Sequence, residues 1–301
     1  MAPSRRVTQA IIGAAILLAG VFLFLKVREG RTFFEPAVLL SRFPVEEAAV
    51  LSADAATLRK AGFLAATATA PEPEYHQFVL DTGFDYRRDL ELVAASFSAS
   101  GTYIIARGHF DWVKLEAYAR RQGGNCYQRL CRMQGSKPDR RISFLPLRDD
   151  TIALAVSTDD LAAAKLENPG PKLTAKLPTE PVWLSVPGTF LRNRDALPAS
   201  LRVTLSGVIN ADRLVFTISQ VGQGIELRMQ ATCRSLDDAR ILQSQLRSNT
   251  TLLKEAIAKG PAAADDLTRT LAAGNFDQTE KLVAGKWPLS RALLDSLTSG
   301  I

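Results

Sequence analysis

The segment Ile225–Cys233, with the sequence IELRMQATC, alternates apolar and polar residues along its whole length. Its apolar residues fall at every second position, namely Ile225, Leu227, Met229, Ala231 and Cys233. Successive side chains of a β-strand point to opposite faces, so this pattern predicts a strand with one face against a core and the other in water. Cys233 lies on the apolar face and is expected to be a small core residue.

Further strands are predicted before this segment, and a helix is predicted after it. Leu201–Ile209 and Arg213–Val221 precede it with short turns between them, which predicts a three-stranded meander. Ser235 is a favoured residue for a helix N-cap, and Leu242 and Leu246 recur after it at helical spacing. This part of the chain therefore combines antiparallel strands with a long helix.

The first half of the chain shows a similar arrangement. Leu92–Phe97 with Thr102–Arg107, and Ile142–Leu147 with Thr151–Val156, are pairs of apolar runs joined by turn residues, which predicts two β-hairpins. Asp111 is expected to cap a helix that lies between them.

These patterns predict an α+β fold made of two tandem modules, each an antiparallel sheet with helices packed on one face. The first module spans residues 41–166 and the second spans residues 182–301; residues 167–181, with four prolines, form the linker. Matching positions suggest an internal duplication, and they are Leu51 with Leu184, Gly101 with Gly224, and Asp149 with Asp277. A chance recurrence of common hairpin and helix units is the alternative.

The C-terminal region is predicted to complete the second module. Leu267–Ala273 and Glu280–Ala284 are apolar runs that predict a hairpin around residues 275–278. Pro288 is expected to open a final helix over Leu289–Leu297, because proline is favoured at the first position of a helix.

The N-terminal region contains an uncharged apolar stretch, Val7–Leu25, with basic residues on both sides. As a helix it would be about 29 Å long, close to the roughly 30 Å hydrocarbon core of a bilayer. We expect a single transmembrane helix over residues 7–25, after a cytoplasmic tail of residues 1–6 and before a juxtamembrane segment of residues 26–40. A cleaved signal peptide and a buried core helix are the alternatives; the length of the stretch and its basic flanks disfavour them.

Two cysteines bear on which side of the membrane the chain lies. Cys126 and Cys131 can form a disulfide only if Tyr127–Leu130 turns back as a four-residue hairpin loop. A disulfide there would indicate an oxidising compartment. The basic residues on the two sides of the apolar stretch nearly balance, so the cysteines decide our prediction. We expect an inner (cytoplasmic) membrane protein with the bulk of the chain outside the cytoplasm.

The chain carries a net charge of +6 and has a sequence pI of about 9.3. Seven basic residues are concentrated between residues 120 and 141, and they are Arg120, Arg121, Arg129, Arg132, Lys137, Arg140 and Arg141. Such a cluster predicts contact with an anionic surface, either lipid head groups or a cell-wall polymer. A solvated rim is the alternative. Tyr127 is the one aromatic residue in this region, so we do not expect nucleic-acid binding.

No pattern in the sequence indicates catalysis. His109 and Asp111 could act as a general base and its orienting carboxylate, but capping a helix is a sufficient role for Asp111. Pairs of adjacent aspartates recur along the chain, and each pair stands at a turn or before a helical run, where carboxylates stabilise helix N-termini. We therefore predict no catalytic residues, no metal site and no cofactor.

Two segments carry a resemblance to known proteins. Arg42–Leu51 (RFPVEEAAVL), followed by Leu58-Arg59, and Thr82–Leu90 (TGFDYRRDL) are similar to segments of single-pass, membrane-anchored bacterial envelope proteins of unknown function. The resemblance covers most of residues 41–166 and weakens beyond the linker. It implies a bacterial envelope protein and assigns no functional residue.

Two classes of function are consistent with these observations. The first is a membrane-anchored, extracytoplasmic binding or scaffold protein, whose partner is an envelope protein, an anionic lipid or a wall polymer. The second is an envelope enzyme, such as a hydrolase, with a site assembled from scattered residues. An enzyme should show a pocket with convergent polar groups and perturbed pKa values, whereas a binding module should show exposed sheet or an apolar patch.

Overall fold

A computed structural model describes residues 36–44, 47–62, 64, 73–135, 138–170, 177–193, 208–222, 224–260, 265–290 and 293. The transmembrane helix expected over residues 7–25, the tail of residues 1–6 and most of the juxtamembrane segment lie outside these residues. In the described part of the chain, no helix combines the length and the apolarity needed to cross a bilayer.

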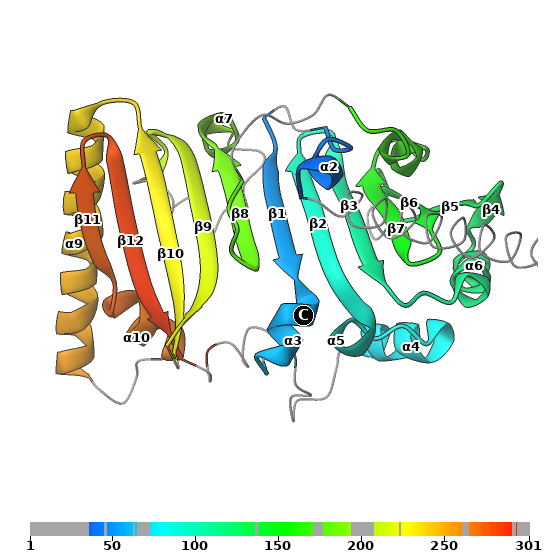
Figure 1. Ribbon diagram of the computed structural model, residues 1–301, viewed down its shortest axis with the longest axis horizontal. Helices are drawn as coiled ribbons and strands as arrows, with labels where there is room; N and C mark the ends of the chain where they lie inside the picture. The colour runs from blue at the N-terminus through cyan, green and yellow to red at the C-terminus, as the bar shows by residue number, and fades with distance from the viewer. Residues whose placement is uncertain are drawn as a thin grey trace, which may run out of the picture.

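The described residues form one twelve-stranded sheet in which every neighbouring pair of strands is antiparallel (Figure 1). The strands are β1 (Ala49–Asp54), β2 (Leu90–Ser98), β3 (Gly101–Gly108), β4 (Asn125–Tyr127), β5 (Leu130–Gln134), β6 (Arg141–Arg148), β7 (Thr151–Ser157), β8 (Val182–Pro187), β9 (Ala211–Val221), β10 (Gly224–Cys233), β11 (Asn275–Thr279) and β12 (Leu282–Leu289). The helices are α2 (Pro36–Leu40), α3 (Ala55–Lys60), α4 (Pro73–Thr82), α5 (Tyr86–Asp89), α6 (Trp112–Arg121), the 3₁₀ helix η1 (Ala162–Leu166), α7 (Gly188–Arg192), α9 (Leu236–Lys259) and α10 (Asp266–Ala272).

The prediction of two tandem modules with separate sheets is wrong. The first strand of each half, β1 and β8, pair directly, with Leu51 opposite Leu184 and Ser52 opposite Trp183. Had each half kept its own sheet, both strands would present an unpaired edge of backbone N–H and C=O groups. Their pairing satisfies those groups and joins the two halves into one sheet.

The two halves have the same strand order, reflected about the β1–β8 pair. From the centre outward, one half reads β1, β2, β3, β7, β6 and the other reads β8, β9, β10, β12, β11, with β5 and β4 added beyond β6. Gly101 and Gly224, matched in the sequence, begin the equivalent strands β3 and β10. The third match fails, because Asp149 lies in the turn between β6 and β7 whereas Asp277 lies within β11.

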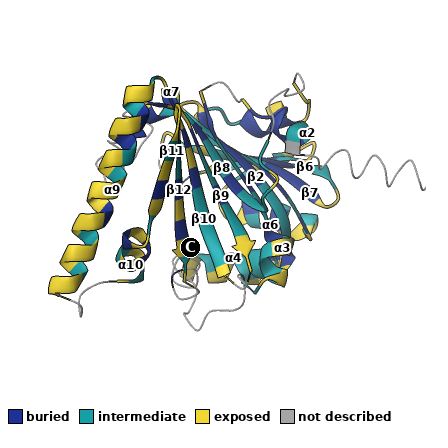
Figure 2. Ribbon diagram, turned by 60° about the vertical axis from the view of Figure 1, so that its left-hand side comes forward, coloured by how far each residue is buried: buried dark blue, intermediate teal, exposed yellow. Residues whose placement is uncertain are grey.

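One row of cross-strand neighbours crosses the whole sheet on a single face. The row runs through Phe276, Gly285, Met229, Phe216, Leu184, Leu51, Ala95, Ile104, Leu154, Phe144, Cys131 and Cys126. Helix α9 covers this face at one end, through Leu242 and Leu246, and α6 covers it at the other end, through Leu115. Figure 2 shows α9 along one side of the sheet with its outer surface exposed. This face therefore carries helices over both halves.

The opposite face is covered in the first half by α2 and η1. Leu39 of α2 and Leu166 of η1 are almost completely buried in a cluster with Ile105 of β3. Because Ile104 and Ile105 are consecutive in a strand, they point to opposite faces. The first half of the sheet is thus covered by helices on both faces, so the expectation of helices on one face only is wrong for this half.

Local signals predicted several elements correctly. The two hairpins of the first half are present as β2–β3 and β6–β7. Asp111 caps α6 by accepting a hydrogen bond from the Lys114 amide, and Ser235 caps α9 by accepting one from the Asp238 amide. The predicted strand Leu201–Ile209 lies largely outside the described residues.

The predicted hairpin at the C-terminus was wrong in its first strand. Leu267 lies in α10, whose N-cap is Asp265, and the hairpin is formed by β11 and β12 instead. Pro288, expected to open a helix, is a residue of β12. Most of the predicted helix Leu289–Leu297 lies outside the described residues. A short apolar run does not distinguish a buried strand from a helix, which explains the error in Leu267–Ala273.

The two ends of the sheet differ in how they terminate. At one end, the Arg247 Nη2 atom of α9 donates a hydrogen bond of 2.8 Å to the Phe276 carbonyl oxygen of the edge strand β11. At the other end, β4 has three residues and is joined to β5 by a tight turn in which Gln128 and Arg129 have φ values of 45° and 71°. Two positive φ values are typical of a type I′ hairpin turn.

We predict that the two halves cannot be separated without unfolding. A protease site placed within residues 171–176 and then cleaved should leave both fragments in one complex, because the β1–β8 ladder and its side chains still join them. Size-exclusion chromatography under native conditions measures this, with the uncut protein as the control. Two separate folded fragments would contradict the single sheet.

Candidate ligand-binding site

The segment Thr82–Leu90, which carries part of the resemblance noted above, forms the corner between α4 and β2. The Thr82 hydroxyl donates to the Phe78 carbonyl oxygen at 2.7 Å and accepts from the Phe84 amide at 3.2 Å. Gly83 between them has a φ of 75°, a conformation that favours glycine. These bonds end α4 and direct Phe84 towards the sheet-facing side of the helices.

Asp85 and Asp89 stabilise the short helix α5 in a reciprocal arrangement. The Asp85 carboxylate caps the helix at the Arg87 amide, and the Asp89 carboxylate accepts from the Asp85 amide at 2.8 Å. Arg88 binds both oxygens of Asp89, each at 2.8 Å. The hydrogen bond from Arg88 is the main reason that the pKa of the Asp89 carboxyl is lowered.

The segment Gly108–Asp111 brings β3 and α6 against this corner. The His109 amide donates to the Asp89 carbonyl oxygen at 3.0 Å, and the Gly108 amide donates to the Asp150 carbonyl oxygen at 2.9 Å. A Cβ atom at Gly108 would lie 2.4 Å from the Asp89 carbonyl oxygen, so this close approach requires glycine. The turn between β6 and β7, the end of β3 and the helix α5 are thereby fixed together.

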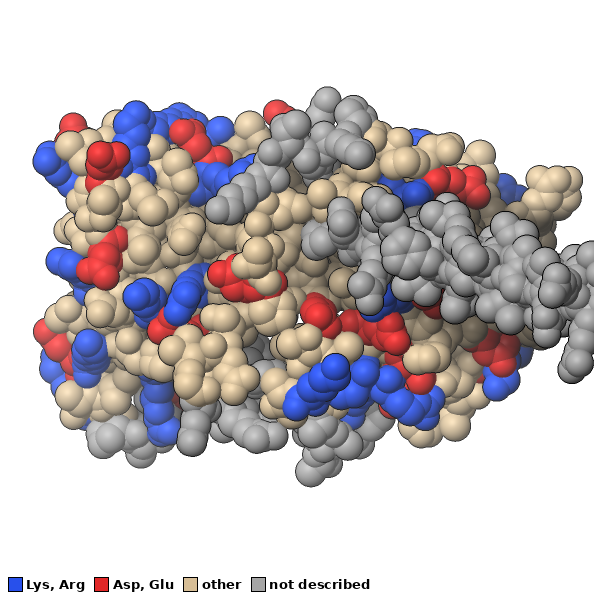
Figure 3. Space-filling model, in the orientation of Figure 1, with Lys and Arg blue, Asp and Glu red and all other residues tan. Residues whose placement is uncertain are grey.

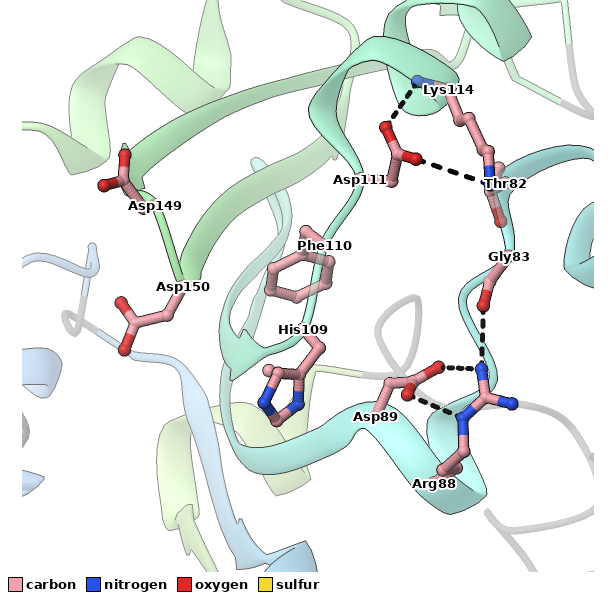
Figure 4. Close-up of a pocket in the computed structure, with 11 residues that line it drawn as sticks. Thr82, Gly83, Arg88, Asp89, His109, Phe110, Asp111, Lys114, Asp149 and Asp150 are labelled. Carbon is pink, nitrogen blue, oxygen red and sulfur yellow. Dashed lines mark hydrogen bonds and ion pairs between the residues drawn. The ribbon is translucent and has the colours of Figure 1, made fainter.

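A polar pocket of about 590 Å³ lies where these segments meet (Figure 4). Its lining includes Arg88, Asp89, His109, Phe110, Asp111, Lys114, Asp149 and Asp150. Figure 4 shows Phe110 in the middle of the ring of polar residues, with the Arg88–Asp89 pair on one side and Asp149 and Asp150 on the other.

The charged residues of this pocket differ in whether they have partners. Arg88 pairs with Asp89, and Lys114 pairs with Asp111 at 3.4 Å. The cap bond from the Lys114 amide is the first reason that the pKa of Asp111 is lowered. Asp111 therefore serves the helix, as the sequence suggested, and the exposed His109 stands beside it without the general-base arrangement that was considered.

A second cavity, of about 420 Å³, lies between the sheet and the helices α4 and α6. We call it the apolar cavity, and its fourteen lining residues are Phe78, Phe84, Leu90, Val93, Ile104, Ala106, Phe110, Leu115, Tyr118, Met133, Ile142, Phe144, Ile152 and Leu154. Every one of these side chains is apolar or aromatic. Ten of the fourteen remain partly exposed although helices cover the sheet here. The helices therefore leave part of this apolar surface uncovered.

Aromatic rings form the wall of the apolar cavity on the helix side. Phe84 stacks on Phe110 with ring centroids 5.0 Å apart and planes inclined by 16°. Phe78 contacts Tyr118 edge to face, with centroids 5.2 Å apart. Burial, followed by the nearby carboxylate of Asp81, raises the pKa of the Tyr118 hydroxyl. These rings come from two stretches of the chain, residues 78–84 and 110–118, and each contact joins one stretch to the other.

The cysteines of the hairpin β4–β5 face each other across the two strands. A disulfide joins Cys126 to Cys131, with Cα atoms 4.0 Å apart. Cys233 is buried without a disulfide, and burial raises the pKa of its thiol. The disulfide closes across a two-residue turn, Gln128-Arg129, because Tyr127 and Leu130 belong to the strands and not to the four-residue loop that was expected.

Six of the seven basic residues of the predicted anionic-surface cluster are described; they lie near this hairpin and the end of α6, and ion pairs offset part of their positive charge. Three of them form ion pairs: Arg120 with Glu116 of the same helix, and Arg121 and Arg132 with Asp81 and Asp160 of other segments. Arg129 lies in the β4–β5 turn, Arg140 and Arg141 lie at the start of β6, and Lys137 lies outside the described residues. Figure 3 shows Lys and Arg mixed with Asp and Glu over one face of the molecule.

A groove of about 650 Å³ lies on the opposite face of the sheet, over β8, β9 and β10. Its charged residues are of both signs, Arg213 and Arg228 with Glu47 and Glu180. Within the described residues no group of three or more His, Cys, Asp or Glu could hold a metal ion.

The sequence analysis did not identify the apolar cavity or its aromatic wall. Phe84 lies in the Thr82–Leu90 segment and Phe110 follows His109, so both rings lie in segments whose other signals are a resemblance and a helix cap. The available signal was the recurrence of aromatic residues next to polar corner residues. What could not be inferred was that these two corners meet.

Comparisons with known proteins define the class of fold. No protein-family model and no curated protein matches this chain. Among solved structures, the chain is similar to crystal form III of TP0453, with a TM-score of 0.50, 8% identity, and coverage of 87% of this chain and 98% of that one. Crystal form I of TP0453 gives a TM-score of 0.49 and 10% identity, covering 88% of this chain and 99% of that one. At 8% identity, the likeness to crystal form III shows a shared fold alone.

We predict that Asp89→Asn destabilises the corner that positions Phe84 and Leu90. The loss should be about 1 to 2 kcal/mol near neutral pH, typical of a lost cap and charge-assisted hydrogen bond. The pKa of Asp89 is lower in the folded than in the unfolded chain, so its contribution is present above the unfolded value of about 3.9 and disappears as the pH falls through the folded value.

Urea unfolding at about pH 7 and about pH 2.5 tests this prediction, because the difference between variant and wild type should shrink at the lower pH. Asp139→Asn, at an exposed turn, is the matched control. An equal difference at both pH values would show that the Asp89 charge does not stabilise the corner.

Proposed function

We propose that this chain is a membrane-associated binding protein of the bacterial envelope that holds an apolar ligand in the apolar cavity. The observation that carries the proposal is the cavity itself: about 420 Å³ lined by apolar and aromatic side chains, most of which keep some exposure. Ligand pockets typically have volumes of about 300–1,000 Å³ and mostly apolar linings.

Energetics support a ligand of this kind. A dry apolar cavity of roughly 150 Å³ is sufficient to bind benzene. This one is nearly three times larger, and a hydrocarbon that buries about 200 Å² of its surface gains roughly 5 kcal/mol before the costs of binding. Binding is favoured over catalysis because the lowered carboxyl pKa values at the neighbouring pocket belong to groups engaged in helix caps and an ion pair.

The membrane and compartment parts of the proposal rest on the sequence and on the disulfide. The uncharged stretch of residues 7–25 suits contact with a bilayer, where apolar ligands are abundant. The Cys126–Cys131 disulfide suits an oxidising compartment outside the cytoplasm. Contact of the basic cluster with anionic lipid remains a secondary proposal, since ion pairs offset part of its charge.

We predict that filling the cavity weakens apolar binding. Ala106, in β3, lines the cavity and is 8% exposed. In Ala106→Phe the new ring should occupy the space of the ligand and weaken binding of Nile red, an uncharged fluorescent probe, by about tenfold or more, a loss of about 1.4 kcal/mol. Fluorescence titration of the purified protein measures it.

Ala258→Phe, on the exposed surface of α9, is the matched control and should bind Nile red like the wild type. Circular dichroism would show that both variants remain folded. If Ala106→Phe folds and binds the probe as tightly as the wild type, the cavity is not the binding site.

We also predict that, in cells quenched with acid, only Cys233 reacts as a thiol once the protein is denatured, because Cys126 and Cys131 are joined. Mass spectrometry after alkylation, with and without a reductant, measures the number of labelled cysteines. Three labelled cysteines without reductant would place this part of the chain in a reducing compartment.

A further inference from the structure

In the described part of the chain, the face of the sheet that carries α6 and α9 is only partly covered over its middle strands. Figure 1 shows α9 at one end of the sheet and α4 and α6 at the other, with β1, β8 and β9 between them. Helix α7 packs at one end of β8 and β9, where Val186 and Leu214 are buried in a cluster with Leu191. Six residues of this face on the three middle strands keep partial exposure and form what we call the apolar band: Leu51, Ala53, Val182, Leu184, Phe216 and Ile218.

The apolar band has the composition of a buried surface but not the packing of one. All of its residues are apolar, whereas the opposite face of the same strands carries Ser185 and Thr217. Leu51, Val182 and Ile218 nevertheless belong to none of the three buried apolar clusters that the described residues form. Contiguous exposed apolar surface of this kind marks binding sites on folded domains.

Two rows of cross-strand neighbours connect the apolar cavity to the apolar band. Each row begins at a partly exposed residue of the cavity lining, Val93 in β2 or Ile104 in β3. Directly opposed side chains of neighbouring strands have Cβ atoms about 5 Å apart, so the apolar surface continues without a break. From β3 to β9 it crosses four strand spacings, or about 19 Å. The rows run from Val93 through Ala53 and Val182 to Ile218, and from Ile104 through Ala95, Leu51 and Leu184 to Phe216.

We infer, resting on the proposed function, that the ligand is a lipid with one long, flexible hydrocarbon chain. The methyl end of the chain lies in the apolar cavity, the rest of the chain lies along the apolar band towards β9, and the head group stays in water. A compact ligand, such as a fused-ring hydrocarbon, would fill the cavity and leave the band exposed. A long chain covers both surfaces, and its flexibility lets it follow the twist of the sheet.

Chain length decides between these two kinds of ligand. Burying one methylene group completely tightens binding about fourfold. A chain that lies on the open band buries about half of its surface there, so each methylene group on the band should tighten binding about twofold. Affinity should therefore keep rising after the chain has filled the cavity, although less steeply than within it.

The test uses alkyl maltosides with eight, ten, twelve and fourteen carbons in the chain, which share one uncharged head group. Each is used below its micelle concentration to displace Nile red from the wild-type protein, and fluorescence gives its Kd. We expect the affinity to rise by about fourfold or more at each two-carbon step up to fourteen carbons.

Substitution within the apolar band should affect the long chains alone. Leu51→Gln, in β1, places a polar amide in the band beside the cavity. It should weaken binding of tetradecyl maltoside by about fourfold or more and leave octyl maltoside nearly unchanged, because the short chain ends within the cavity. Ile218→Gln, in β9, repeats the test farther along the band should Leu51→Gln fail to fold.

Val215→Gln is the matched control, because Val215 is also partly exposed in a middle strand but lies on the opposite face. It should bind all four maltosides as the wild type does. Ala106→Phe should weaken all four, since every chain enters the cavity. Circular dichroism would show which variants are folded.

Two results would overturn the long-chain assignment and leave the cavity proposal intact. The first is an affinity that levels off once the chain is longer than the cavity. The second is a folded variant of the apolar band that binds tetradecyl maltoside as tightly as Val215→Gln does. If neither Nile red nor any of the four maltosides binds the wild-type protein, the proposed function itself fails.

Discussion

The pairing of β1 with β8 is the interaction on which the rest of the structure depends. Each strand is the first of its half, and each lacks a partner on one side until the other half supplies it. With Leu51 opposite Leu184, the apolar row of one half continues into the row of the other without a break. A register shift of one residue would turn that row to the opposite face on one side, so the central pair also fixes where the helices of both halves can pack.

The two halves share a strand order but cover the same face differently, and this difference produces the site. In the second half, α9 has 24 residues and buries Leu242 against β10 and β12. In the first half, α4 and α6 have ten residues each, and aromatic side chains bridge the space between them and the sheet. Two short helices leave unfilled volume between them and the sheet, and the apolar cavity lies in this space.

Much of the fold could be predicted from interactions between residues that are close in the sequence. The pairing of strands that are far apart in the sequence could not. Caps such as Asp111 and Ser235, and hairpins joined by short turns, depend on residues within a few positions of each other. The β1–β8 pair joins residues more than a hundred positions apart, and no sequence pattern in either strand indicates which strand it will pair with. The same limit applies to the site: Phe84 and Phe110 stand at two corners that meet only after Gly108 allows β3 to approach α5.

The way in which the sheet ends has a consequence for the molecule in a crowded envelope. Antiparallel strands at an edge can accept a strand from another molecule and so begin a fibre. Here Arg247 of α9 occupies the Phe276 carbonyl oxygen at one edge, and at the other a three-residue strand is tied back by a disulfide. Within the described residues, the sheet that joined its two halves edge to edge thus has features at both outer edges that hinder the same contact with another molecule.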